Sequence, residues 1–224
     1  MARREGARPR RRAANSEERG QSAERTREKI LRAAVAEFGA KGYSGARTAA
    51  IAKRAGVNQQ LISYHFGGKQ GLLDELRRRW AEAESARVPA GTTFGTSFAA
   101  YLDAVLDRPD WSRLVIWQAL GDHAGDDDEA AAALQAGLRA EVDRLRQRQA
   151  EGEIAVDPDP RFVLLLWYAL TFAPLALPEH VRSILGSDPT SREYRRWCHD
   201  QVLMLLDPAR SRTVADTTPA GPGD

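Results

Sequence analysis

Residues 47–66 read RTAAIAKRAGVNQQLISYHF, and this stretch decides the fold. A helix-turn-helix needs two short helices joined by a tight turn, with small residues where the helices cross and apolar residues on the inner face of the second helix. Ala52 and Ala55 provide the close approach, and Gly56 provides the turn. The apolar residues that we predict to face inward after the turn are Val57, Leu61 and Ile62.

The other side chains of the second helix are predicted to point outward, and their chemistry suits DNA. Asn and Gln can form two hydrogen bonds with the adenine edge in the major groove. Ser, Tyr and His can contact bases or phosphates, and Lys69 follows two glycines, where it could bind a phosphate at the start of the next helix. The outward set is Asn58, Gln59, Gln60, Ser63, Tyr64 and His65.

The flanking sequence is helical throughout. Apolar residues from Ile30 to Phe38 recur on one helical face, and Gly42 is predicted to end that helix. Asn58 can cap the second helix of the motif. A capping box from Thr190 to Glu193 is predicted to open the last helix. Because no stretch shows the two-residue alternation of a sheet, the sequence predicts an all-α fold.

Composition narrows the class of protein. The chain has 224 residues, 42% of them hydrophobic and 29% charged, which is ordinary for a globular protein. The single cysteine, Cys198, excludes an intramolecular disulfide and a Cys-rich zinc site. The arginine-rich N-terminus lacks an apolar stretch behind it, and the apolar run 162–177 is short for a membrane span. We therefore expect a cytoplasmic protein with no membrane partner.

The charge is divided unevenly along the chain. Residues 1–80 carry 19 Lys and Arg against 8 Asp and Glu, a net charge of +11, whereas the remainder carries 14 against 23, a net charge of −9. A basic front half on an acidic back half indicates that only the front meets a polyanion. For the arginines of residues 1–20 two interpretations stay open, a minor-groove arm and a solvated tail without a partner.

The order I-A-x-x-A-G-V-x-x-x-x-I-x-Y-H-F-x-x-K-x-x-L, from Ile51 to Leu72, resembles the signature of the TetR family of regulators. The resemblance covers residues 24–84. It implies an N-terminal three-helix helix-turn-helix DNA-binding domain and a C-terminal helical domain for ligand binding and dimerisation. It also implies that Gln59, Gln60 and His65 lie near base edges or the backbone, and that Tyr64 and Lys69 contact phosphates. Together with the outward residues and the start of the motif, the candidate DNA-binding residues are Arg47, Thr48, Asn58, Gln59, Gln60, Ser63, Tyr64, His65 and Lys69.

The sequence departs from the family pattern at two positions. Ser63 replaces the aromatic residue that the family usually has before the Tyr-His pair. Arg47 stands where the family usually caps its second helix with Ser or Thr. Either Thr48 caps a helix shortened by one residue, or Arg47 replaces the cap with a phosphate contact.

These observations predict five segments. They are a disordered basic tail over residues 1–20, a DNA-binding domain over 21–68, a linking helix over 69–88, a ligand-binding and dimerisation domain over 89–208, and a disordered tail over 209–224. The resemblance implies a homodimer that pairs helices at about residues 162–173 and 191–206. An effector pocket is expected to use aromatic and polar residues of the back half: Trp117, Gln118, Trp167, Tyr168, Thr171 and Phe172.

The predicted function is that of a dimeric repressor that binds a palindromic DNA operator and is released by an unidentified small molecule. No cofactor and no metal site is expected. A nonspecific basic protein that coats DNA is the main alternative, and a small helical enzyme is a remote one. We find no GxSxG, HExxH, Walker loop or GxGxxG motif, and therefore expect that the protein is not an enzyme.

Overall fold

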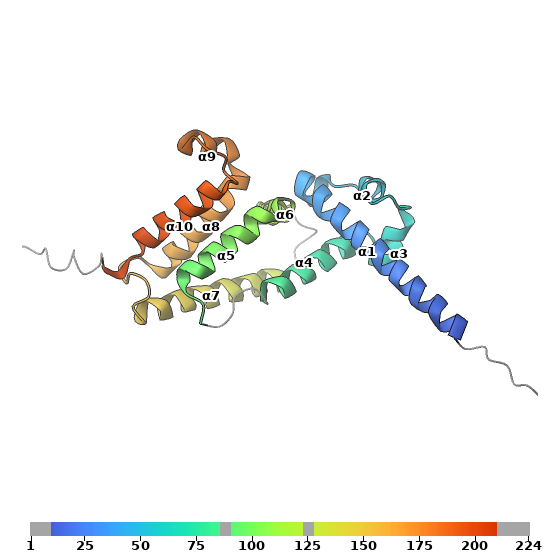
Figure 1. Ribbon diagram of the computed structural model, residues 1–224, viewed down its shortest axis with the longest axis horizontal. Helices are drawn as coiled ribbons and strands as arrows, with labels where there is room; N and C mark the ends of the chain where they lie inside the picture. The colour runs from blue at the N-terminus through green and yellow to red at the C-terminus, as the bar shows by residue number, and fades with distance from the viewer. Residues whose placement is uncertain (1–9, 86–90, 123–127, 210–224) are drawn as a thin grey trace, which may run out of the picture.

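The computed structural model describes residues 10–85, 91–122 and 128–209. Within these ranges the chain forms helices and no strand, which confirms the all-α prediction. Figure 1 shows α1 to α3 at one end of the molecule, α4 leading away from them, α6 next to α1, and α5, α8, α9 and α10 toward the other end, with α7 running below. The helices are α1 Arg10–Gly45, α2 Thr48–Ala55, α3 Gln60–Phe66, α4 Lys69–Ser85, α5 Phe94–Asp107, α6 Pro109–Ala119, α7 Asp128–Ala150, α8 Pro160–Ala176, α9 Pro178–Leu185 and α10 Arg192–Leu205.

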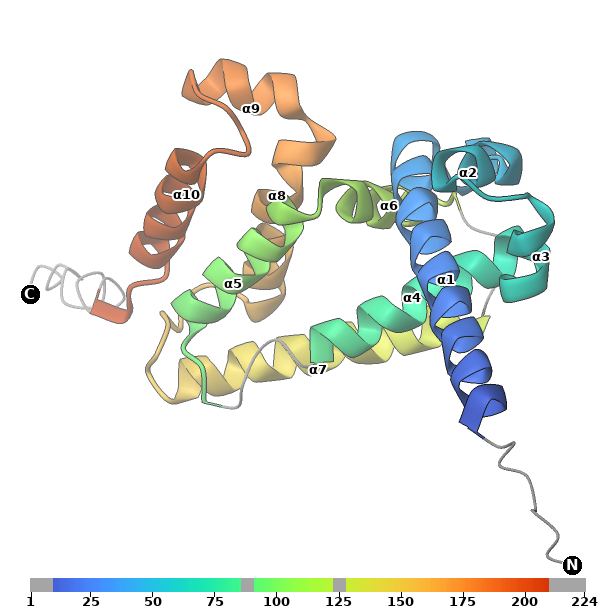
Figure 2. The ribbon, with the colours of Figure 1, turned by 45° about the vertical axis from the view of Figure 1, so that its right-hand side comes forward.

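The N-terminal core forms where α1 packs against α2, α4 and α6. Ile30, Leu31 and Phe38 of α1 are buried, as their helical spacing predicts. Trp111 and Leu114 of α6 belong to this same core, although they lie far along the chain from the DNA-binding motif. The first core is therefore completed by a helix from the C-terminal half, which lies beside α1 in Figure 2.

The second core lies among α5, α8 and α10, with α7 and α9 against α8. Phe98, Val163 and Cys198 are among its most deeply buried side chains. Tyr194 of α10 donates a hydrogen bond from its hydroxyl to the carbonyl of Leu170 in α8, over 2.8 Å. These contacts join the three helices into one body, from which α9 projects in both views (Figures 1 and 2).

The start of α1 corrects one prediction. The predicted disordered tail covers residues 1–20, but α1 begins at Arg10. Residues 10–19 are mostly Arg, Ala and Glu, which are strong helix formers, and no Gly or Pro interrupts them. Helix propagation costs little once the amphipathic stretch further along has formed, so the helix extends back to the residue after Pro9. The predicted tails at residues 1–9 and 210–224 lie outside the described residues.

The end of α1 and the starts of α8 and α10 lie close to where the sequence predicts them, with the cap of α10 one residue later. Gly42 interrupts α1 with a φ of 69°, so the predicted stop at this residue is confirmed as a kink. The side chain of Asp159 accepts from the backbone N–H of Arg161 and caps α8. The predicted capping box is wrong by one residue, because Ser191 caps α10 while the Thr190 hydroxyl donates to Asp188.

No single helix in the described ranges is long and apolar enough to cross a membrane. Taken together, α8 and α9 reach the required length and hydropathy, but the two helices are bent by 100° relative to each other.

Candidate nucleic-acid interface

The turn between α2 and α3 has the geometry that a helix-turn-helix requires. Gly56 adopts a left-handed conformation, with φ 68° and ψ 36°, and ends α2. The next N–H, of Val57, donates to the carbonyl of Ala52 over 3.0 Å, which closes the end of the helix. A side chain at Gly56 would be strained at this φ, so glycine sets the angle between the two helices.

Helix α3 divides cleanly into an inner and an outer face. Ile62, only 1% exposed, and Phe66 anchor the helix in the first core. Tyr64 is 81% exposed, and Gln60 and Ser63 are exposed with it. The sequence prediction is therefore confirmed for Ile62, which points inward, and for Gln60, Ser63 and Tyr64, which point outward, whereas the burial of Phe66 was not predicted.

Gln59 and Asn58 are held by local hydrogen bonds. The Gln59 amide nitrogen donates to the Thr48 hydroxyl over 2.9 Å, which ties the start of α3 to the start of α2. The Asn58 side chain accepts from the backbone N–H of Gln60 over 2.9 Å and so satisfies the first N–H of α3, although the N-cap position itself is Gln59, one residue after the predicted one. Both Asn58 and Gln59 remain exposed.

The bond to Gln59 also excludes one of the two alternatives for the start of α2. Thr48 is the first residue of α2, and its hydroxyl accepts from Gln59 instead of capping the helix. The N-cap position is Arg47, whose backbone is extended and whose side chain makes no capping bond. The prediction that Thr48 caps a shortened helix is wrong, because α2 already includes Thr48.

His65 and Lys69 are less free than the sequence alone indicates. His65 is half-buried, with its ring edge against Tyr64, and its carbonyl accepts from the Arg27 side chain of α1 over 3.0 Å. The Lys69 ammonium lies 4.4 Å from the centre of the Tyr43 ring and 3.4 Å from the Ser44 carbonyl oxygen. Lys69 therefore starts α4 while contacting the end of α1.

Close to the Lys69 contacts, Asp122 from the C-terminal half of the chain binds the end of α1. The Asp122 carboxylate, just after α6, accepts from the backbone N–H of Ser44 over 3.0 Å. Burial acts to raise the pKa of Asp122, but the hydrogen bonds from Ser44 and Tyr43 and the charge of Lys69 outweigh it and lower the pKa. Asp122 is therefore held as an anion where α1, α4 and the end of α6 meet.

Two of the predicted effector residues lie at this same junction. The Trp117 indole N–H donates to the carbonyl of Gly39 in α1 over 3.2 Å. With its carboxamide turned to present oxygen, Gln118 accepts from the Arg77 guanidinium of α4 over 2.9 Å. The structure thus places Trp117 and Gln118 between the two halves of the chain, apart from the other four predicted effector residues.

Those four residues lie together on α8. The Trp167 ring is 5.2 Å from Phe98 and 5.8 Å from Tyr101, centre to centre, and the Tyr168 and Phe172 rings stack at 6.3 Å. Thr171 is fully buried, and its hydroxyl donates to the Trp167 carbonyl of its own helix. The sequence selection omitted Phe94, Phe98 and Tyr101, whose helical spacing on α5 was the available signal.

Helices α8 and α10 also carry apolar side chains on their outer faces. On α8, Phe162 and Leu165 are exposed, and on α10 Trp197 and Met204 are exposed. Tyr194, Cys198 and Val202 instead fill the inner face of α10, so this helix is apolar on two sides. Burial raises the pKa of the Cys198 thiol to about 11, which fits a packing role.

Helix α3 presents polar side chains outward, and a glycine turn fixes it on a bundle of helices. This arrangement defines a DNA-binding regulator of the helix-turn-helix class. Two family models match the chain. The one described as bacterial regulatory proteins, tetR family, covers residues 30–76, and the one described as tetracyclin repressor-like, C-terminal domain, covers residues 98–203. The chain belongs to the TetR family of transcriptional regulators.

Similar proteins agree with this assignment. The HTH-type transcriptional repressor SCO4008 of Streptomyces coelicolor is 28% identical over 73% of this chain and 85% of that protein. The probable HTH-type transcriptional regulator YttP of Bacillus subtilis is 45% identical, but only over 27% of this chain and 29% of its own length. The crystal structure of the putative regulator SCO4942 from Streptomyces coelicolor superposes with a TM-score of 0.65 at 27% identity, covering 81% of this chain and 98% of that one. Regulators of this family bind DNA operators and act as dimers.

Proposed function

We propose that this TetR family regulator is a repressor that binds a palindromic operator as a dimer and is released by a small molecule. The observation that carries the proposal is the outer face of α3, where exposed polar and aromatic side chains stand on a helix anchored by Ile62 and Phe66. A short helix of this kind enters the major groove with its first residues against the base edges.

Gln59 is the side chain that we assign to base recognition. One of its two amide N–H groups is used by the Thr48 hydroxyl, which fixes the side-chain conformation. The second N–H and the carbonyl oxygen stay available, and these are the donor and acceptor that a bidentate contact with adenine requires. Thr48 therefore acts as a positioning residue for Gln59.

The other residues that we predict to contact DNA lie in or directly beside α2, α3 and α4. Arg47 is exposed at the start of α2, and Gln60, Ser63 and Tyr64 are exposed along α3. We propose phosphate contacts for Arg47 and Tyr64, and contacts with bases or the DNA backbone for Gln60 and Ser63. Asn58, His65 and Lys69 lie at the ends of this surface. The net charge of +11 over residues 1–80 supplies the attraction to DNA that does not depend on sequence.

Dimerisation through α8 and α10 is proposed from their exposed apolar faces. Phe162 and Leu165 are one turn apart on α8, and Trp197 and Met204 are two turns apart on α10, so each pair lies along one stripe. Large apolar side chains exposed together mark an interaction surface. A second copy of the chain would cover both stripes by forming a four-helix bundle, and would present two α3 helices to one DNA duplex.

We propose that the effector binds at the aromatic cluster around Trp167, with Tyr168, Thr171 and Phe172 beside it. Its effect would reach DNA through Trp117 and Gln118, because these side chains contact α1 and α4 directly. An effector with higher affinity for a form in which the two α3 helices are wrongly spaced lowers operator occupancy by linkage.

Selection of bound fragments from a random DNA pool, followed by titration of the selected site, tests the proposal. We expect one palindrome. We also expect Gln59→Ala to lower discrimination at one base position by about 1–3 kcal/mol. Thr48→Val should weaken the same discrimination in part, and Gln147→Ala, an exposed change on α7, should leave it intact. Affinity that ignores sequence, and that is lost when the chain is truncated to start at Gln21, would instead indicate a nonspecific DNA-coating protein.

A further inference from the structure

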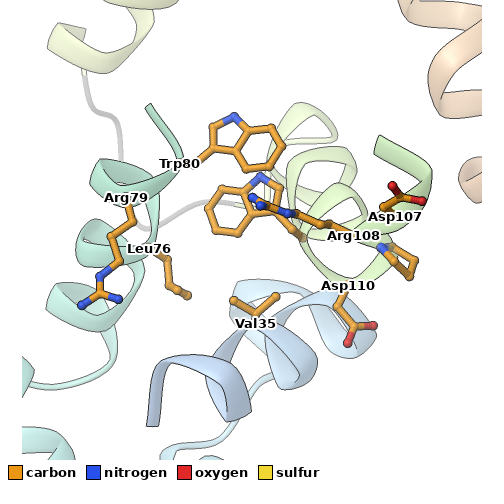
Figure 3. Close-up of a pocket in the computed structure, with 9 residues that line it drawn as sticks. Val35, Leu76, Arg79, Trp80, Asp107, Arg108 and Asp110 are labelled. Atoms are coloured by element: carbon orange, nitrogen blue, oxygen red, sulfur yellow. The ribbon is translucent and has the colours of Figure 1, made fainter. Parts of the chain in front are cut away.

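A cavity of about 360 Å³ lies between α1, α4 and the corner where α5 meets α6 (Figure 3). Val35 of α1, Leu76 and Trp80 of α4, and Pro109 and Trp111 of α6 provide its apolar lining. Its volume falls within the range of small-molecule sites in proteins. None of Trp167, Tyr168, Thr171 and Phe172 lines this cavity, so it is separate from the proposed effector cluster.

Two stacked indole rings form one wall of the cavity. The Trp80 and Trp111 rings are 4.9 Å apart and inclined by 17°. Trp111 is only 7% exposed, yet its buried indole nitrogen finds no hydrogen-bond acceptor among the residues that the structure describes. A buried indole N–H normally has an acceptor, and leaving it without one is unfavourable. This wall therefore combines a flat aromatic surface with an unused donor.

Among the charged residues around the cavity, all but one are paired with other residues that the structure describes. Arg79 is held by Glu75 of its own helix, α4, and by Glu28 of α1. Asp107 binds the Arg195 guanidinium over 2.8 Å, and Asp110 lies 3.5 Å from Arg113. Arg108 is the charged lining residue without a side-chain hydrogen bond or ion pair to any described residue.

Arg108 lies at the α5–α6 corner, at the C-cap position of α5. Figure 3 shows its side chain extending from that corner across the cavity toward α4. Its guanidinium therefore adds a positive charge that no described residue pairs, next to the apolar and aromatic wall, whereas the other charged lining residues, Arg79, Asp107 and Asp110, are already paired. Guanidinium groups bind carboxylates through two parallel hydrogen bonds.

We propose that this cavity is a binding site for a small aromatic carboxylate. The aromatic ring would lie against Trp80 and Trp111, and the carboxylate would pair with Arg108. With a small adjustment of its ring, Trp111 would gain the acceptor that its N–H lacks. Because the lining comes from α1, α4 and α6, an occupant contacts both halves of the chain at once. The consequence for operator affinity rests on the proposed function, whereas binding itself does not.

Calorimetric titration of the full-length protein with 2-naphthoate, with 2-naphthamide as its neutral isostere, tests the site. We expect naphthoate to bind about tenfold more tightly than the amide, which is the contribution of one charge-assisted contact at a half-open site. Arg108→Gln should remove this preference, and Arg113→Gln, an exposed change that does not line the cavity, should keep it. Val35→Phe should fill the cavity and abolish binding while helix content, measured by circular dichroism, is unchanged.

Absence of naphthoate binding at millimolar concentration, equal binding of naphthoate and the amide, or full binding by Val35→Phe would each overturn the site. The second measurement is affinity for the selected palindrome with and without naphthoate, where we expect a change of about fivefold or more. An unchanged affinity at saturating naphthoate would overturn the regulatory role. A protein that binds naphthoate but no palindrome would refute the proposed function alone.

Discussion

Replacing Gly39 by alanine tests the contact between the two halves of the chain directly. A methyl group on Gly39 would lie 2.2 Å from the carbonyl oxygen of Asp110, at the start of α6. Carbon and oxygen atoms in contact are normally about 3.3 Å or more apart, so α6 would have to move by about 1 Å. The obstacle is backbone, which cannot turn away as a flexible side chain could.

The expected magnitude follows from two opposing effects. Alanine is better than glycine inside a helix by about 0.5–1 kcal/mol. Overpacking at a close contact costs about 1–3 kcal/mol. The difference of the two ranges is about 0–2.5 kcal/mol, so we expect Gly39→Ala to lower the free energy of unfolding by about 1 kcal/mol. The matched control is Gly137→Ala in α7, where an added methyl group meets no atom within 4 Å and should stabilise the protein by about 0.5–1 kcal/mol.

Chemical denaturation, followed by circular dichroism, measures both variants against the parent protein. The displacement of α6 should also disturb the Trp117 hydrogen bond to Gly39, so operator affinity should change in Gly39→Ala and not in Gly137→Ala. Equal stabilisation by both substitutions would refute the reasoning, because it would mean that α1 and α6 do not approach each other this closely in solution.

Three further predictions concern other parts of the chain. The pKa of Glu75 is lowered from 4.5 to about 2, chiefly by its hydrogen bond with Arg78. As the pH falls through this range the unfolded chain takes up the proton first, so Glu75→Gln should cost up to about 3 kcal/mol at neutral pH and almost nothing near pH 2, as measured by denaturation. The Cys198 thiol, buried and with a raised pKa, should react with a thiol reagent only on unfolding; fast reaction in the native protein would contradict its packing role. Leu165→Glu on α8 should give monomers in light scattering while Leu134→Glu on α7, equally exposed, should not; a dimer in both would exclude this face of α8.

The DNA-binding motif could be predicted because its signals are local. Gly56 must adopt a left-handed conformation, and the spacing of Ile62 and Phe66 decides which face of α3 is buried. Since a helix of two turns has only one way to bury such a pair, the exposure of Gln60 and Tyr64 follows from the same pattern. The hydrogen bond of the Asn58 side chain likewise joins it to a neighbour two residues away.

The features that the sequence did not predict depend on contacts between distant residues. Thr48 has the chemistry of a helix cap, but its actual partner is Gln59, across the turn. Trp117 has the chemistry of a pocket residue, but Gly39 lies within reach of its N–H because α6 crosses α1. Apolar periodicity on α10 cannot distinguish Cys198, which is buried in the core, from Trp197, which is exposed.

The completion of the first core by Trp111 and Leu114 limits how this protein can be re-engineered. Chimaeric regulators are usually imagined as a DNA reader cut from one protein and joined to the sensor of another. A cut after α4 would remove Trp111 and Leu114 from the buried cluster that they share with Phe38 and Leu72, leaving an aggregation-prone apolar surface. A working graft would therefore have to bring a foreign helix with side chains of matching volume, or carry α6 across with the reader.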